Sequence, residues 1–330
     1  MTKEKQQFLD MVQAAERIAV STHMRPDGDA LGSSGAMYHW LRSKGKEAIV
    51  VLSDPAPDTV KFIHEGVCSV SFRENPEEAE KALKEADLII ATDYNVLGRS
   101  GEAESSIRAS KAPKALFDHH IGPDKETFSP VFSREEVSSA CEIVYEQLKD
   151  EALPAEAARC LMAGMTTDTN NFANSVYPGT LQMASELIAA GVDRDAIINE
   201  LYNRYRPNRV KAFAWFLSNK LTLRPNGIAS IIITRKEWHD FGLLDGELEG
   251  LVNIPLSIDE VKMVVYLRQD PEKNFYHCSL RSKKGWSANR MAVDHFHGGG
   301  HENASGGRLY WPEDISAPED ALAYIDNLTI

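Results

Sequence analysis

The chain has 330 residues, of which 43% are hydrophobic and 26% are charged, and its formal net charge is -13. This composition is typical of a soluble globular protein, and the lack of any run of about 18 apolar residues argues against a membrane-spanning helix. Proteins that grip long nucleic acids through many phosphates usually present a basic surface. The acidic charge therefore argues against that class unless the nucleic acid is short or is held by metal ions; solubility explains the charge equally well.

The length predicts about two domains of roughly 150 residues each. The N-terminal segment MTKEKQQFLDMV is charged and amphipathic, and it lacks the apolar core and the cleavage site of a secretory signal. The four cysteines are scattered without the pairing of a metal site, so we expect them to be reduced and mostly buried. Together these features predict a cytoplasmic protein.

Short apolar runs alternate with helical patterns along the first part of the chain. A helical period covers residues 3–16, and helical patterns also cover GSSGAMYHWLRSKG and PEEAEKALKEA. The apolar runs are predicted strands: Ile18–Ser21, Ala48–Leu52, Val70–Phe72, Leu88–Thr92 and Ala115–Phe117. They show little polar alternation, which is typical of parallel strands that are buried on both faces and joined by helical crossovers.

The pattern changes twice in the second part of the chain. Residues 138–220 are mostly helical, and a hairpin candidate then surrounds Asn226-Gly227, a strong turn signal. The segments KMVVYLRQ and FYHCSLRS form a second predicted strand pair around the turn DPEKN. We therefore predict an α/β protein: a parallel-sheet domain with helices on both faces at residues 1–190, a helical linker at 191–220, and a smaller mixed α/β domain at 221–330.

Acidic and histidine residues follow three of the predicted strands. Because ligands of open parallel sheets sit at the carboxyl ends of the strands, we expect these side chains to gather at one place. Their crowded carboxylates would repel one another unless cations neutralise them. The residues are His23, Asp27 and Asp29 after the first strand, Asp93 after the fourth, Asp118, His119 and His120 after the fifth, and Asp168 at the end of an apolar helix.

Mixed carboxylate and imidazole ligands favour a divalent-ion site. They suit Mn²⁺ or a similar ion rather than the thiolate-rich sites of structural zinc. Four or more acids with two histidines can hold two ions, and ions about 3.5–4 Å apart can generate hydroxide and stabilise charge in phosphoryl transfer. Each motif alone has a simpler explanation, with Asp27-Gly28 as a turn, Ser33 or Ser34 as a helix cap, and Asp93 as the cap of a following helix. Their joint position in one domain favours the metal site.

The segment HFHGGGHENASGG is the second informative stretch. Its glycines, Gly298, Gly299 and Gly300, leave backbone N–H groups unshielded and permit positive φ, as phosphate-binding nests require; a flexible loop is the competing interpretation. His301 could then donate to a phosphate or stack on a base. Arg281, at the end of a predicted strand, is either a phosphate-binding fork or an exposed surface arginine. For His295 and His297 we expect exposed or packing roles, since no further ligand is spaced to complete a metal site.

The motifs HMRPDGDALGS, TDYN, FDHH, TTDTNNF and GGGHENASG together resemble the DHH/DHHA1 phosphoesterases, and within them the compact oligoribonuclease and pAp-phosphatase members. They run in the family's order from His23 to Gly306. The resemblance implies a dimetal DHH domain facing a DHHA1 substrate-binding domain across a cleft, with a homodimer as the expected assembly. One departure is TDTNNF, where many relatives carry glycine after the second threonine; it leaves Asp168 intact and concerns only the local loop.

The resemblance also implies a role for each candidate residue. His23, Asp27 and Asp93 would hold one ion, and Asp29, Asp93, His119 and Asp168 the other, so that Asp93 bridges them. Asp118 would support the histidines. His120 would lie near the scissile phosphate and donate a proton to, or hydrogen-bond with, the leaving group. Arg281, the backbone of Gly298, Gly299 and Gly300, and His301 would hold the remaining phosphate or the terminal base.

The expected activity follows from the dimetal hypothesis. A hydroxide bridging two ions, Mn²⁺ in preference to Mg²⁺ or Co²⁺, would attack phosphorus in line while the metals neutralise the developing charge. Short oligoribonucleotides, cut from the 3′ end or from either end, would give 5′-mononucleotides, and 3′-phosphoadenosine 5′-phosphate (pAp) would give AMP. Long duplex nucleic acids and membranes are not expected partners.

Three alternatives remain open at this point. A cyclic-dinucleotide phosphodiesterase acting on c-di-AMP, or a linear-dinucleotide phosphodiesterase, would use the same ions. A manganese-type inorganic pyrophosphatase would share the first domain, but the segment GGGHENASG argues against it. A non-catalytic nucleotide or RNA binder is disfavoured by the full set of ligands and by the acidic charge.

Overall fold

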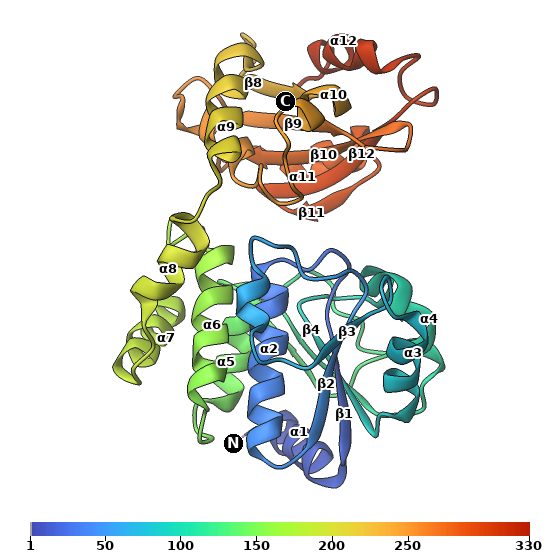
Figure 1. The fold of residues 1–330 in the computed structure, drawn as a ribbon, viewed down its shortest axis with the longest axis vertical. Coiled ribbons are helices and arrows are strands. Elements are labelled where there is room, and N and C mark those ends of the chain that lie inside the picture. The colour runs from blue at the N-terminus through green and yellow to red at the C-terminus, as the bar shows by residue number, and fades with distance from the viewer. Residues whose placement is uncertain (1) are drawn as a thin grey trace. The chain divides into compact units, whose positions relative to one another are not determined.

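The computed structural model describes residues 2–330 and divides into two compact units, Met1–Arg204 and Tyr205–Ile330 (Figure 1). The division falls within residues 191–220, for which the sequence predicts a helical linker. Two helices occupy most of that segment, α8 (Arg194–Tyr202) in the first unit and α9 (Pro207–Asn219) in the second. None of the helices within residues 2–330 combines the length and the apolarity that crossing a bilayer requires.

A six-stranded parallel sheet forms the centre of the first unit. Its strand order is β3-β2-β1-β4-β5-β6, and every neighbouring pair is parallel. The strands are β1 (Arg17–Ser21), β2 (Glu47–Leu52), β3 (Ser69–Ser71), β4 (Leu88–Thr92), β5 (Lys114–Asp118) and β6 (Val131–Ser133). The five predicted strands are thus confirmed, whereas the sequence interpretation misses β6.

Helices cover both faces of this sheet, as its apolar strands require (Figure 1). Successive residues of β1 point to opposite faces, so that Ile18 and Val20 pack in one apolar cluster and Ala19 in another. The first cluster includes side chains of α1 (Lys3–Ala14), α2 (Gly28–Ser43), α5 (Ala140–Leu148), α6 (Ala155–Asp168) and α7 (Pro178–Ala189). The second includes side chains of α3 (Pro76–Glu85) and α4 (Glu104–Ala109). The predicted fold class of this part is confirmed.

The strand order creates a switch point at the carboxyl end of the sheet. From β1 the chain crosses to β2 on one side, whereas β4 and β5 lie on the other side of β1. The loops that follow β1 and β4 therefore lead in opposite directions, and open α/β sheets bind their ligands at such a point. His23 lies in the first of these loops and Asp93 in the second.

Glycines let α2 and α6 pack backbone against backbone. A methyl group on Gly32 would lie 2.7 Å from the carbonyl oxygen of Cys160 and 2.8 Å from the Cα of Gly164, closer than side chains approach. The crossing brings the first turn of α2, which carries Asp29, beside the last turn of α6, which ends at Asp168. Asp29 and Asp168 therefore lie close together because Gly32 and Gly164 have no side chains.

We expect Gly32→Ala to lower the free energy of unfolding by about 1–3 kcal/mol, the usual cost of overpacking, even though alanine gains about 1 kcal/mol in helix propensity. Urea unfolding followed by circular dichroism measures the change. Gly98→Ala is the control, because its added methyl group would have its nearest neighbour at 3.9 Å. If both variants matched the wild type in stability, the close packing of the two helices would be contradicted.

The second unit holds a mixed six-stranded sheet in the order β11-β12-β10-β9-β8-β7. Strands β8 and β9 pair in parallel, and the other neighbours are antiparallel. Side chains of α9 pack on one face, and side chains of α11 and α12 on the other. The elements are β7 (Thr222–Leu223), β8 (Ile228–Ile233), α10 (Arg235–Asp240), β9 (Met263–Gln269), β10 (Phe275–Ser282), α11 (Ala288–His295), β11 (Gly299–His301), β12 (Ala304–Tyr310) and α12 (Ala321–Asp326). The predicted smaller mixed α/β part and the hairpin at Asn226-Gly227 are confirmed.

The three-glycine segment is part of a strand. Gly299–His301 forms β11 at the sheet edge and pairs antiparallel with β12, so the flexible loop considered from the sequence is wrong. Among Gly298, Gly299 and Gly300, the left-handed range of φ is reached by Gly300 alone, at 148°. Gly298 is needed for a different reason, because a methyl group there would overlap the carbonyl oxygen of Gly306. Close approach of two backbones explains this glycine better than a nest does.

Candidate metal centre

His23, in the loop after β1, faces two carboxylates. Its Nδ1 donates a hydrogen bond to the carbonyl oxygen of Met24 at 2.9 Å, which leaves Nε2 as the atom directed at the acids. Nε2 lies 3.3 Å from Oδ2 of Asp93 and 3.8 Å from Oδ1 of Asp27. A histidine whose other nitrogen is fixed by a backbone carbonyl is the usual arrangement in a metal ligand.

Asp27 has two roles in the structure. Its Oδ1 caps α2 by accepting hydrogen bonds from the backbone N–H groups of Asp29 and Ala30, as the simpler interpretation of the sequence predicts. The same oxygen faces His23. The capping role therefore places a carboxylate at the cluster rather than excluding it.

Asp93 lies between the two histidine groups and is buried. Its backbone has a φ of 63° and its N–H donates to the carbonyl oxygen of Phe117 at 2.9 Å. Its Oδ1 accepts no hydrogen bond from any residue that the structure describes, although Nε2 of His119 lies 3.5 Å away. A left-handed, non-glycine residue with a buried and unsatisfied oxygen is costly, and such features concentrate at functional sites.

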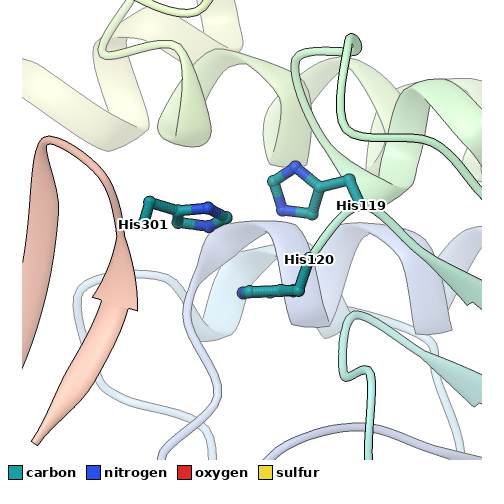
Figure 2. A group of neighbouring side chains, drawn as sticks. All are labelled: His119, His120 and His301. Atoms are coloured by element: carbon teal, nitrogen blue, oxygen red, sulfur yellow. The ribbon is translucent and has the colours of Figure 1, made fainter. Parts of the chain in front are cut away.

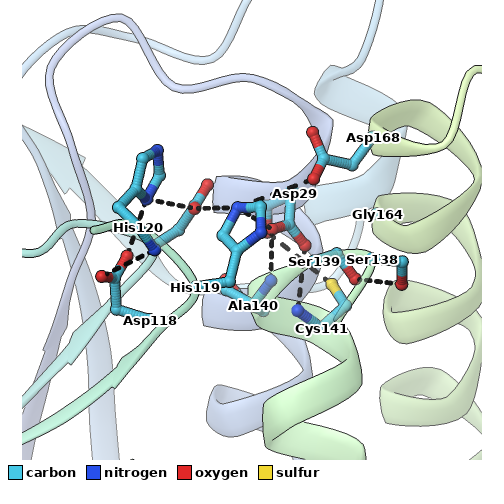
Figure 3. Close-up of polar contacts among 12 residues, drawn as sticks. Asp29, Asp118, His119, His120, Ser138, Ser139, Ala140, Cys141, Gly164 and Asp168 are labelled. Atoms are coloured by element: carbon cyan, nitrogen blue, oxygen red, sulfur yellow. Dashed lines mark hydrogen bonds and ion pairs between the residues drawn. The ribbon is translucent and has the colours of Figure 1, made fainter. Parts of the chain in front are cut away.

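His119, directly after β5, is surrounded by three carboxylates (Figure 3). In addition to Asp93, its Nε2 lies 3.6 Å from Oδ2 of Asp168 and 3.8 Å from Oδ2 of Asp29. These three acids come from the loop after β4, the end of α6 and the start of α2. The structure thus brings together residues that lie far apart in the sequence.

Asp29 is held by the N-terminus of α5 (Figure 3). Its Oδ2 accepts from the backbone N–H of Ala140 at 2.6 Å, and its Oδ1 accepts from that of Cys141 at 2.9 Å. The positive end of a helix suits a carboxylate in this position. Our sequence interpretation misses these backbone donors, although the pattern Ser139-x-x-Glu142 is a helix-start signal, and Ser139 does cap α5.

His120 is oriented by Asp118 (Figure 3). One oxygen of Asp118 accepts from Nδ1 of His120 at 2.8 Å, and the other accepts from the backbone N–H of His120 at 3.0 Å. Figure 2 shows the rings of His119 and His120 on the loop after β5, and His301 on β11; the centroids of the first two rings are 4.8 Å apart. Asp118 is fully buried, so its contact with His120 fixes the direction of the ring.

The candidate ligands form two triads that share Asp93. His23, Asp27 and Asp93 place one ligand atom each within 4.8 Å of one another, and so do Asp29, Asp93 and His119. Asp168 lies next to the second triad through its contact with His119. Oxygen and imidazole donors without thiolates suit Mn²⁺ and similar ions, and a cation between the triads would satisfy the buried oxygen of Asp93. The donor set therefore fits divalent ions.

Clustering shifts the pKa values of these groups strongly. Burial raises the pKa of Asp168 to about 7, with help from the charges of Asp27 and Asp93. Burial alone would lower the pKa of His119, but its contact with Asp93 and the charges of Asp168, Asp93 and Asp29 raise it to about 10. The pKa of His23 is also raised well above its ordinary value, because contacts with Asp27 and Asp93 outweigh the opposing effect of burial.

Metal binding should therefore release protons. At pH 7.5 His119, with a pKa of about 10, carries a proton in the metal-free protein, and the raised pKa values of His23 and Asp29 favour protons there as well. Because a metal ligand must be deprotonated, we expect at least one proton to be released per chain on saturation with Mn²⁺. Affinity should accordingly rise with pH. Calorimetric titration in buffers of different ionisation enthalpy measures the number, with injections of Mn²⁺ into each buffer alone as controls. A binding enthalpy that does not change with the buffer would contradict the charge state derived for His23 and His119.

Arg281 and His301 lie in one row across the second sheet. Ala304 of β12 pairs with Arg281 of β10 on one side and with His301 of β11 on the other. Directly paired residues point to the same face, so the two longer side chains stand on either side of a methyl group. The next row on this face consists of Ser279, Gly306 and Gly299. On this face, the residues between the guanidinium of Arg281 and the imidazole of His301 are therefore small.

Three sequence candidates of this unit have hydrogen-bond partners in the structure: Arg281, His297 and His295. Nη1 of Arg281 donates to the carbonyl oxygen of Leu280 at 2.9 Å. Nε2 of His297 lies 2.8 Å from Oδ1 of Asp314, in agreement with the packing role expected for it. His295 ends α11, where its carbonyl oxygen accepts from the hydroxyl of Tyr324.

Comparisons with known proteins cover both units. The model of the DHH family, N-terminal domain, matches residues 17–165, and the model of the DHHA1 domain matches residues 227–327. A Streptococcus mutans protein named probable bifunctional oligoribonuclease and PAP phosphatase NrnA is 29% identical over 97% of this chain and 97% of its own length. A probable manganese-dependent inorganic pyrophosphatase of the same organism is 33% identical, but over only 46% of this chain and 48% of its own length.

A solved structure matches the whole chain. The crystal structure of an exopolyphosphatase-related protein from Bacteroides fragilis has a TM-score of 0.90 and 33% sequence identity over 99% of this chain and 96% of that one. The two family models follow one another in the order of the two structural units. With the shared motifs and two ligand triads in the first unit, the chain belongs to the DHH/DHHA1 family.

Proposed function

We propose that this protein is a divalent-metal phosphoesterase that hydrolyses short oligoribonucleotides to 5′-mononucleotides and pAp to AMP. The observation that carries the proposal is the pair of carboxylate–imidazole triads joined at Asp93. The nearly full-length similarity to the Streptococcus mutans protein supports the substrate class, since that relative is named for both activities. The motif similarity in the second unit favours a nucleotide over a bare pyrophosphate.

Two ions, Mn²⁺ in the first instance, would occupy the two triads. His23, Asp27 and Asp93 would hold one, and Asp29, Asp93, His119 and Asp168 the other. When bound, they supply Lewis-acid activation of water and neutralise charge on the phosphoryl oxygens. The chain's part is to fix these ligands: the Met24 carbonyl orients His23, and the backbone of α5 holds Asp29.

His120 would transfer a proton to the departing 3′-oxygen. Because Nδ1 bonds to Asp118, the ring presents Nε2 as its second nitrogen. Asp118 is thus a positioning residue that acts through His120. The buried carboxylate holds the ring in one orientation, so less conformational entropy is lost when the ring reaches its position in the transition state.

The second unit would bind the nucleotide portion that is not cleaved. The row Arg281–Ala304–His301 offers a cation and an imidazole on either side of small residues, and a planar base or a phosphate would lie over them. The three-glycine segment would contribute only backbone groups to this binding, from Gly298, Gly299 and Gly300. The homodimer and the cytoplasmic location expected from the sequence stay predictions.

Substrate assays test the proposal directly. The purified full chain is incubated with a diribonucleotide, a length series of oligoribonucleotides, pAp, c-di-AMP and pyrophosphate, in Mn²⁺ and in Mg²⁺, and bound metal is measured per chain. We expect turnover of the diribonucleotide and pAp, and two ions per chain. Preferential turnover of c-di-AMP would replace the proposed substrate with the cyclic one, and a metal-free chain without turnover would overturn the proposal.

A further inference from the structure

A cavity of about 370 Å³ lies within the second unit. Its walls come from the end of α9, from the strand ends of β8, β9 and β10, and from the start of α12. The strand residues Ile232 and Tyr276 belong to the apolar cluster on the α12 face of the sheet, as does Leu280, the neighbour of Arg281. Because successive residues of a strand alternate between faces, Arg281 and His301 lie on the opposite face, and the cavity is separate from them.

A buried arginine, Arg224, lies behind the wall residue Ser230 and has an unused donor. Nε of Arg224 donates to Oδ1 of Asp326 at 2.7 Å, and Nη1 donates to Oγ of Ser230, a wall residue, at 2.8 Å. Nη2 is buried and has no acceptor among residues 2–330. The side chain is only 8% exposed, and the planar guanidinium keeps Nη2 next to Nη1 and hence beside Ser230. Arg224 therefore holds the hydroxyl of Ser230 in place at the wall of the cavity.

Two wall amides present a fixed donor and a fixed acceptor. Oε1 of Gln269 accepts from the backbone N–H of Arg235 at 3.0 Å, so its NH₂ group is the half that remains for a ligand. Nδ2 of Asn219 donates to the carbonyl oxygen of Trp215 at 2.9 Å, which leaves its Oδ1 as an acceptor. The identities of the partners therefore decide the orientation of both amides.

The cations around the cavity are already paired, and the wall residue Glu319 adds a negative charge. Lys220 pairs with Glu237, and Arg224 pairs with Asp326. No excess of positive charge is left for a multiply charged phosphate, whereas Ile232 and Leu322 supply apolar wall. The site therefore suits a ring of mixed polarity that carries an acceptor and a donor on its edge.

We propose that this cavity is a second ligand site, which binds the nucleoside moiety of a nucleoside or mononucleotide. A nucleobase edge presents the acceptor that Gln269 requires and the donor that Asn219 requires. The choice of nucleosides over other planar amides rests on the proposed function, because mononucleotides are its products. The cavity itself is independent of the metal centre.

Binding of the four common ribonucleosides, AMP and inorganic phosphate to the full chain tests the site by calorimetry in EDTA. Leu322 is 45% exposed and lines the cavity, so Leu322→Trp should fill its mouth without disturbing the core. Ala323→Trp adds the same side chain one residue away, at an exposed position that does not line the cavity. Gln269→Glu keeps the acceptor for Arg235 and removes the donor.

We expect at least one ribonucleoside to bind, with affinity falling about tenfold or more in Leu322→Trp and Gln269→Glu and staying within about twofold in Ala323→Trp. Equal binding by Leu322→Trp and wild type, or no ribonucleoside binding at millimolar concentration, would overturn the site. If inorganic phosphate by itself displaced the bound ribonucleoside from the site, the nucleoside assignment would be overturned. Diribonucleotide turnover is assayed on the same preparations, so a failure of the proposed function is seen separately.

Discussion

Asp93→Asn should lose turnover by a factor of about 10³ or more and should retain less metal at both triads, because this one carboxylate is the member they share. Asparagine has nearly the same shape and tolerates the left-handed φ of 63°, so the fold should survive. Mass-spectrometric metal analysis of the purified variant and diribonucleotide turnover in Mn²⁺ measure the two effects.

Asp58→Asn is the matched control for Asp93, since the side chain of Asp58 is 61% exposed and pairs only with Lys61 among the described residues. It should keep full activity and full metal content. Near-normal turnover by Asp93→Asn would refute the shared-ligand assignment. Loss of turnover with both ions retained would instead show that Asp93 acts in chemistry and not in metal binding.

His120→Ala should lower kcat by about 10²–10⁴ while the metal content stays that of the wild type, because proton transfer to the leaving group is lost and Asp118 already holds Nδ1 of His120. The structure also groups His120 with Asp93 and Asp118, so the metal content decides whether His120 is a ligand. Asp118→Asn should have a smaller effect of the same kind, since it weakens the bond that orients the ring. Steady-state kinetics of both variants against a diribonucleotide, together with metal analysis, check the expectation.

A substrate with a better leaving group separates the two roles. A 5′-nucleotide ester of p-nitrophenol needs little protonation of its leaving oxygen, so His120→Ala should regain most of its activity on it, whereas Asp93→Asn should not. If His120→Ala stayed equally impaired on the activated ester, His120 would not be the acid. If it lost metal, it would belong with the ligands.

Much of the fold is predictable from the sequence because the buried parallel strands are continuous apolar runs. The runs that end in Thr92 and Phe117 identify both the strands and the edge at which Asp93 and His119 gather. Hydrophobic pattern and turn residues are local properties, and for this part of the chain they determine the architecture.

The finer features of the site depend on contacts between distant segments. Nothing near Asp29 in the sequence indicates that the backbone of Ala140 and Cys141 will hold it. Likewise, the register that aligns Arg281 and His301 about Ala304 arises from pairing across three strands. The sequence leaves a nest and a flexible loop open for the three glycines and does not indicate a strand, because the partner that crowds Gly298 is the distant strand that begins at Ala304.

The loops after β1, β4 and β5 and the end of α6 contribute ligands that have no reason to meet in an unfolded chain. Ions that bind the assembled cluster therefore favour the native state by mass action. The folding equilibrium constant grows with the ratio of the ion concentration to its dissociation constant. The melting temperature of the first unit should follow the supply of divalent ions. Scarcity of divalent ions would then reduce the amount of folded enzyme as well as its rate of turnover.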